Sequence, residues 1–281
     1  MSKAGYLYAA GAVALFSTSP VLVRWASGVS AVEITFWRLL LATLTVLAFG
    51  ALSRRPVRWR RLPHRRFAIY GVVIALHFFL YIASLFFTSV AHSLALVYTA
   101  PLFIAAFSRA FLHEPLTARK WLGVALGVAG VAVLTGFEPK ITPRMLLGDA
   151  LAIGSAITFA IYSVIGRARR SADPLFDYTA GVYGWGAIWL LPLALWQAPH
   201  SQYDVRSALA LLGLGLGPLG TGHTLYNAAL RRIPATYANI IATLEVPGGV
   251  LLSALLLGEL PSTAALAGAG IVLAGILLVV R

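Results

Sequence analysis

The feature that most constrains this chain is a series of ten long apolar segments separated by short polar connections. Each segment approaches the roughly 20 residues that an α-helix needs to cross the hydrocarbon core of a bilayer. The segments are continuously apolar and lack the alternation of a membrane barrel, so the sequence predicts an all-α integral membrane protein. The ten expected spans cover residues 4–24, 32–52, 67–88, 91–112, 119–137, 146–167, 174–196, 206–230, 235–257 and 263–280.

Composition excludes most other classes of protein. Hydrophobic residues make up 59% of the 281 residues and charged residues only 11%, which is more apolar surface than a soluble fold can cover. The chain has no cysteine, and its histidines lack paired spacing on one helix face, so we expect no metal site. A phosphate-binding loop motif does not occur in the sequence, so we expect no nucleotide and no other cofactor.

The distribution of Lys and Arg predicts that both termini lie in the cytoplasm. Placing the N-terminus there puts 17 of the 22 basic residues on the cytoplasmic side, which is the asymmetry that the positive-inside rule describes. We therefore interpret the net charge of +13 as a topology signal and expect no nucleic-acid partner. For the basic run from Arg54 to Arg66, contact with anionic lipid or RNA is the alternative to a plain orientation signal.

The second half of the chain repeats landmarks of the first half. The matching residues include the one acid between two apolar segments and the glycines that follow it, and such a duplication has to be recognised before a fold is assigned. Pairs separated by 145 residues are Tyr81 and Tyr226, Ala83 and Ala228, Ser108 and Ser253, Glu114 and Glu259, Gly123 and Gly268, and Gly130 and Gly275.

Each half contains five expected spans, over residues 1–138 and 146–281, with residues 139–145 as a linker. Since five is odd, the second half enters the membrane from the opposite side, and the halves form an inverted-topology repeat. Glu114 then faces the cytoplasm and Glu259 the outside. Such repeats are typical of secondary transporters, in which a central cavity near the membrane midplane lies between the halves and opens alternately to either side.

The same landmarks resemble those of a known family. They are Arg38, Ala42, Pro101, Glu114, Leu116, Thr117, Gly123 and Gly130 in the first half, and Glu245, Glu259, Gly268 and Gly275 in the second. In this arrangement the chain resembles the EamA-type exporters of the drug/metabolite transporter superfamily. Its aromatic-rich third, fourth, sixth and seventh spans are most similar to the bacterial aromatic amino acid exporters. One departure is that Val246 separates Glu245 from Pro247, whereas the family has Glu-Pro, so the kink is expected one residue later.

The resemblance implies a bacterial inner-membrane protein that exports amino acids, aromatic and other neutral ones, and related small metabolites by alternating access. It also implies that spans 1, 3, 4, 6, 8 and 9 line the cavity. Broad efflux of drugs and cations is the alternative, and it requires a carboxylate such as Glu245 exposed in the cavity. An intramembrane enzyme is disfavoured because no nucleophile or second acid matches the single buried acid. A scaffold protein would not need polar groups that face the midplane.

Glu245 is the one acid deep within a predicted span, where an ionised carboxylate costs about 2.5–3.5 kcal/mol. We expect it to bind a substrate ammonium or to titrate in proton coupling, and the alternative is a structural carboxyl that braces its helix against Asn239, Asn227 or Arg38. The other expected cavity residues are polar and aromatic side chains suited to flat or cationic solutes, with helix packing as the alternative. They are His77, Tyr81, Tyr98, Ser17, Thr18, Phe159, Tyr162, Trp185, His223, Tyr226, Asn227 and Asn239.

Prolines and glycines mark the expected kinks or hinges, because a proline in a span frees a carbonyl that a nearby hydroxyl can satisfy. The expected positions are Pro20, Pro101, Gly217, Pro218 and Pro247. Glycines at small-residue spacing in the fifth and tenth spans are expected to bring helices together within one subunit, with dimer contact as the alternative. We therefore expect a monomer or a weak homodimer.

Overall fold

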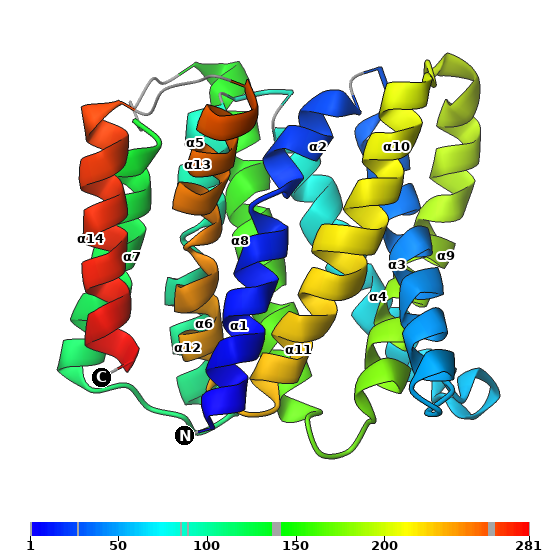
Figure 1. The fold of residues 1–281 in the computed structure, drawn as a ribbon, viewed down its shortest axis with the longest axis horizontal. Helices are drawn as coiled ribbons and strands as arrows, with labels where there is room; N and C mark the ends of the chain where they lie inside the picture. Colours follow the sequence, from blue (N-terminus) through cyan, green and yellow to red (C-terminus); the bar gives the residue numbers. More distant parts are fainter. Residues whose placement is uncertain are drawn as a thin grey trace.

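Helices dominate the described residues and run between two edges of the molecule (Figure 1). The computed structural model describes the chain apart from residues 1, 27, 85, 89, 137–141, 258–261 and 281, and it leaves out the side chains of 20, 24, 90–92, 94, 250, 253 and 254. No strand occurs within these described parts. The predicted counterpart acid Glu259 lies outside them, and the predicted kink residue Pro20 is described only in its backbone.

The helices are listed here with their bounds in chain order. The α-helices are α1 (Lys3–Phe16), α2 (Ser19–Trp25), α3 (Ala31–Leu52), α4 (His64–Ser84), α5 (Val90–Val97), α6 (Ala100–Phe111), α7 (Ala118–Leu134), α8 (Pro143–Ala168), α9 (Leu175–Gln197), α10 (Val205–Leu214), α11 (Thr224–Leu230), α12 (Ala235–Ala242), α13 (Glu245–Leu257) and α14 (Thr263–Val280). Two 3-10 helices, η1 (Trp59–Arg61) and η2 (Ala198–His200), and one π-helical segment, η3 (Gly215–His223), complete the set. Because α8 begins at Pro143, it takes in the end of the predicted linker.

Seven helical stretches are long and apolar enough to cross a membrane. A helix suits this environment because it satisfies its backbone groups within its own segment. The stretches are Lys3–Val23, Ala31–Leu52, His64–Ser84, Pro143–Ala168, Leu175–His200, Val205–Leu230 and Thr263–Val280, and a shorter apolar stretch covers Ala95–Phe111.

Both termini lie at the same edge of the molecule (Figure 1). The connections that follow α3, α6, α8 and α11 also lie at this edge, whereas the connection between α9 and α10 lies at the other edge. The basic run from Arg54 to Arg66 belongs to the first of these connections and to the start of α4. We call the edge that holds the termini the basic edge.

Three of the apolar segments are interrupted partway along. The interruptions separate α1 from α2 at 17–18, α5 from α6 at 98–99, and α12 from α13 at 243–244. In each, a threonine hydroxyl donates to the carbonyl oxygen three residues earlier. The bonds are Thr18 to Leu15 at 2.7 Å, Thr99 to Leu96 at 2.6 Å, and Thr243 to Ile240 at 2.6 Å.

These hydroxyls satisfy carbonyl groups that an unbroken helix would have paired with backbone N–H groups. The breaks at 98–99 and 243–244 occupy matching positions of the two halves, 145 residues apart. Pro247 lies inside α13, after the break. The expectation that the kink falls one residue later than in the family's Glu-Pro pattern stays a prediction.

The helices α7 and α14 pack against each other through glycines. A Cβ atom added to Gly275 would lie 2.6 Å from the Gly123 carbonyl oxygen, and one added to Gly130 would lie 2.6 Å from the Val272 nitrogen. Such contacts let the two backbones touch directly. These glycines therefore serve packing within the subunit, as the sequence predicts in preference to dimer contact.

Two valine substitutions in α14 test this contact. A Cβ at Gly268 would clash with the Leu134 backbone, whereas a Cβ at Gly270 meets nothing within 4 Å. We expect Gly268→Val to lower the stability of the detergent-purified protein by about 1–3 kcal/mol, because overpacking forces the helices apart. Thermal unfolding measures the effect, and Gly270→Val should unfold close to the wild-type temperature. Equal losses in both variants would contradict the contact.

Candidate functional site

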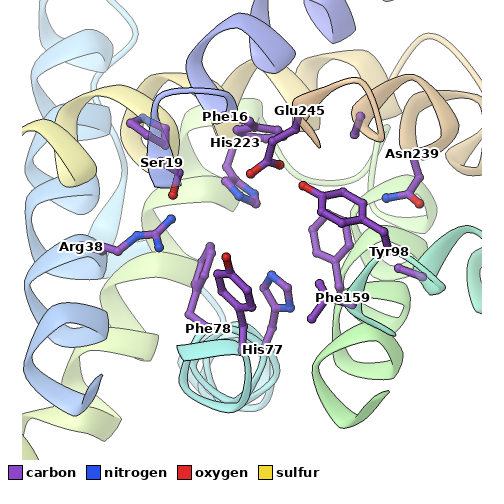
Figure 2. A pocket seen from close by; sticks show the side chains of 15 residues that line it. Phe16, Ser19, Arg38, His77, Phe78, Tyr98, Phe159, His223, Asn239 and Glu245 are labelled. Carbon is purple, nitrogen blue, oxygen red and sulfur yellow. The ribbon is translucent and has the colours of Figure 1, made fainter. Parts of the chain in front are cut away.

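The interrupted helices meet around a cavity (Figure 2). It offers about 70 Å³ to the centres of water-sized molecules. A single water needs ~10–15 Å³ of such volume, so the cavity has room for roughly five to seven waters or one small solute. Its walls are formed by Phe16, Ser19, Arg38, His77, Phe78, Tyr81, Val97, Tyr98, Ala100, Phe159, Pro218, His223, Asn239, Ala242 and Glu245.

Many of these wall residues lie at helix ends created by the breaks. Phe16 ends α1, Val97 ends α5 and Ala242 ends α12, while Ala100 and Glu245 begin α6 and α13. Each of the six spans expected to line the cavity contributes a wall residue. The second span is not among these six, yet Arg38 of α3 also lines the cavity.

Arg38 and Glu245 reach into the cavity from different walls (Figure 2). Arg38 is 3% exposed, and its guanidinium lies 4.5 Å from the centre of the Phe78 ring. Its Nε and Nη1 atoms have no hydrogen-bond partner among the described residues. Across the cavity, the hydroxyl of Tyr98 is turned toward the Glu245 carboxylate. The cavity thus holds one cationic and one acidic side chain.

Two histidines, His77 and His223, belong to the aromatic part of the cavity wall. The Ser155 hydroxyl donates to the His77 carbonyl oxygen at 2.9 Å, and His77 Nδ1 lies 3.1 Å from the Ser155 carbonyl oxygen. Nδ1 therefore carries the hydrogen and donates it, which leaves Nε2 of a neutral ring as an acceptor. The His77 ring stacks on Phe159 at 4.7 Å, and the His223 ring lies 4.5 Å from Phe16.

Several predicted site residues lie behind the wall. Tyr162 and Tyr226 pack against Phe159, with ring centroids 5.9 and 5.6 Å away. Asn227 donates to the Tyr162 hydroxyl and, at 2.8 Å, to the His223 carbonyl oxygen. These three residues support the aromatic wall and do not line the cavity.

Ser17 and Thr18 also lie outside the wall, within the break between α1 and α2. Their hydroxyls donate to the carbonyl oxygens of Val13 and Leu15, at 2.8 and 2.7 Å. Trp185 lies elsewhere, because its Nε1 faces His64 Nδ1 at 3.3 Å near the start of α4. Of the predicted site residues, those that the structure brings to the cavity are His77, Tyr81, Tyr98, Phe159, His223, Asn239 and Glu245.

The sequence interpretation did not assign Arg38, Phe16 or Phe78 to the cavity. Arg38 carried a usable signal, since a cation within an apolar span needs a partner or a cavity. Phe16 and Phe78 carried none, because an aromatic residue in an apolar segment is equally compatible with packing. Ser17, the predicted neighbour of Phe16, lies outside the wall, whereas His77 lines the cavity together with its neighbour Phe78.

The predicted kink residues lie at irregular backbone. Pro101 occupies the first turn of α6 and Pro247 that of α13. Pro218 lies inside η3 and forms part of the cavity wall, and Gly217 precedes it. Whether any of them acts as a hinge stays a prediction.

A second, larger hollow opens at the basic edge. It measures about 840 Å³, and apolar residues such as Phe49 and Leu225 share its walls with charged ones. Asp177 is its acidic wall residue, and its Oδ1 accepts from the Arg58 backbone at 3.1 Å. Five arginines give this hollow a positive character. They are Arg54, Arg55, Arg58, Arg231 and Arg232.

Ion pairs at this edge join segments that are distant in sequence. Arg167 at the end of α8 contacts Glu114 at 2.8 Å and donates to the Leu230 carbonyl oxygen at 2.9 Å. Asp173 is paired with Arg66 at 2.8 Å and with Arg169 at 2.9 Å. Arg169 donates a hydrogen bond to the Asp173 carboxylate, and this bond raises the pKa of the Arg169 guanidinium. Glu114 thus connects the segment between α6 and α7 to the end of α8.

Interrupted spans that meet around a cavity with charged and aromatic walls are typical of membrane transporters. The EamA-like transporter family matches the chain twice, over residues 3–136 and 146–281. The chain is therefore a member of the EamA-like transporter family.

Individual proteins show the same relationship. An uncharacterized transporter of Archaeoglobus fulgidus is 30% identical to the chain over 84% of each protein. The threonine/homoserine exporter RhtA of Escherichia coli is 27% identical over 82% of this chain and 75% of its own length. One crystal structure, 21% identical, superposes with a TM-score of 0.88 over 99% of this chain and 96% of that chain, and so has the same fold.

Two methionine substitutions test whether Arg38 is unpaired. An unpartnered buried charge opposes folding, so Arg38→Met should leave the unfolding temperature in detergent unchanged or raise it. Arg167→Met removes the partner of Glu114 and of a backbone carbonyl, and should cost about 1–3 kcal/mol. A loss of stability in Arg38→Met equal to that in Arg167→Met would show that Arg38 is a structural residue.

Proposed function

We propose that this protein exports amino acids, aromatic and other neutral ones, and related small metabolites across the bacterial inner membrane by alternating access. The observation that carries the proposal is the cavity in which helix ends from both matched halves meet around charged and aromatic side chains. Aromatic rings provide flat apolar contact, and charged groups recognise the polar part of a small solute. Membership of a transporter family and the name of the Escherichia coli relative support export of this kind.

The proposal includes ten spans in two inverted halves. The spans are α1–α2, α3, α4, α5–α6, α7, α8, α9, α10–α11, α12–α13 and α14. Three observations support the inversion: matched breaks in α5–α6 and α12–α13, contact between the counterpart helices α7 and α14, and the opposite directions of α6 and α13 (Figure 1). In such a repeat, rocking one half against the other exposes the site to each side in turn.

The orientation follows from the basic edge, which the positive-inside rule assigns to the cytoplasm. The arginine-lined hollow then opens toward the cytoplasm, where an exporter collects its substrate. Its positive field favours the approach of solutes that carry a carboxylate. We infer a monomeric unit, since the glycines of α7 and α14 are used within the subunit.

Broad efflux of cations is the second candidate function. The specific observation in its favour is that Glu245 lines the cavity, as a cation carrier requires. Arg38 in the same cavity opposes it, because a like charge disfavours entry of a cation.

Flux measurements in liposomes separate the two candidates. We expect purified protein to release preloaded labelled threonine and phenylalanine well above the rate of protein-free liposomes. Tyr98→Ala should change the ratio of the two rates, because Tyr98 lines the cavity, whereas Trp185→Ala should preserve it. Flux of quaternary ammonium ions without flux of amino acids would replace the first candidate with the second.

Labelling of single cysteines tests the orientation, and the natural absence of cysteine makes the chain ready for it. The exposed residues Ser53 and Ser171 follow α3 and α8, and the exposed residue Gln202 precedes α10. In intact cells, an impermeant thiol reagent should label Gln202→Cys, and should label Ser53→Cys and Ser171→Cys only after lysis. Labelling of all three from one side would contradict the topology.

A further inference from the structure

Arg38 differs from the other arginines whose contacts hold the fold together. Arg167 has a carboxylate and a carbonyl partner, and Arg66 and Arg169 share the Asp173 carboxylate. The Arg38 guanidinium is more deeply buried, yet two of its nitrogens have no partner in the described part of the chain. A buried donor left unsatisfied costs free energy, so a ligand that accepts from it gains a strong interaction.

Glu245 is the acid that lines the same cavity, but it does not form an ion pair with Arg38. No ion pair joins them among the described residues, although both side chains line one small cavity (Figure 2). The cavity itself separates the two charges. A guest that lies between them meets a cationic group on one side and an acidic group on the other.

Uncharged wall residues next to Arg38 and Glu245 are consistent with a cationic side and an acidic side of the cavity. The guanidinium rests on the Phe78 ring, which holds its plane without using its hydrogen-bond donors. The Tyr98 hydroxyl is turned toward Glu245. The Arg38 side chain therefore reaches the cavity with two unpaired nitrogens, whereas the carboxylate is oriented by a neighbour.

We propose that Arg38 binds the carboxylate and Glu245 the ammonium of a zwitterionic α-amino acid, so that the transporter selects for both groups together. This inference rests on the proposed function and narrows its substrate class. An amine without a carboxylate leaves Arg38 unpaired next to a second positive charge. A carboxylic acid without an amine leaves Glu245 unpaired next to a second negative charge. Both arrangements are penalised where water is scarce.

The test uses three related probes: phenylalanine, phenethylamine, which lacks the carboxylate, and 3-phenylpropionate, which lacks the amine. Wild-type protein in liposomes should transport phenylalanine and discriminate against both analogues. Arg38→Gln should lower the apparent affinity for phenylalanine by roughly 30-fold or more and should increase the transport of phenethylamine. Glu245→Gln should lower the apparent affinity for phenylalanine by a similar factor and should increase the transport of 3-phenylpropionate. If the two residues had only a structural role, the two variants would not change substrate preference in opposite directions.

Two controls keep the test decisive. Arg38→Lys keeps the charge but loses the two-pronged contact, and should retain part of the phenylalanine affinity. Arg60→Gln makes the same change as Arg38→Gln at an exposed position and should behave as wild type. Size-exclusion profiles and unfolding temperatures check that every variant is folded.

The outcomes separate this inference from the proposed function. If folded Arg38→Gln transports phenylalanine with unchanged affinity and still rejects phenethylamine, the pairing of Arg38 with the carboxylate is wrong while amino acid export stands. If the wild type transports phenethylamine but not phenylalanine or threonine, amino acid export itself is wrong, and the inference is overturned with it.

Discussion

Hydrocarbon offers no hydrogen-bond partner, so every backbone group that leaves a helix within the membrane has to find one inside the protein. The rest of this structure depends on how that requirement is met at its three breaks. Thr18, Thr99 and Thr243 each satisfy a carbonyl oxygen one turn earlier, and this permits interrupted backbone within apolar segments. The breaks lie together at the cavity, and the wall residues Phe16, Val97, Ala100, Ala242 and Glu245 occupy helix ends that the breaks create.

The same requirement governs the charged side chains. At the basic edge, arginines are paired with carboxylates or carbonyl groups, and there they connect distant segments, as Arg167 does for Glu114 and Leu230. Inside the cavity the charges of Arg38 and Glu245 stay apart. Among the described residues, the ion pairs thus stabilise the fold near the basic edge, whereas Arg38 and Glu245 line the cavity without forming an ion pair.

The sequence predicts the all-helical membrane fold well, because long apolar runs are a direct consequence of the bilayer. It predicts individual wall residues less well. Tyr98 and Trp185 look alike in the sequence, yet one lines the cavity and the other packs near His64. An apolar helix has no polar face to reveal its rotation. The role of Arg38 depends on its distance from Glu245 and from other acceptors, which only the packing of α3 against its neighbours determines.

The glycine contact between α7 and α14 has a mechanical consequence. Each helix belongs to a different matched half of the chain, and their backbones touch with no side chains in between. This contact leaves little room for the two helices to slide along each other, because sliding would press carbonyl oxygens against Cα atoms. If the halves move, this contact is the natural fulcrum, and an opening on one side of it implies a narrowing on the other.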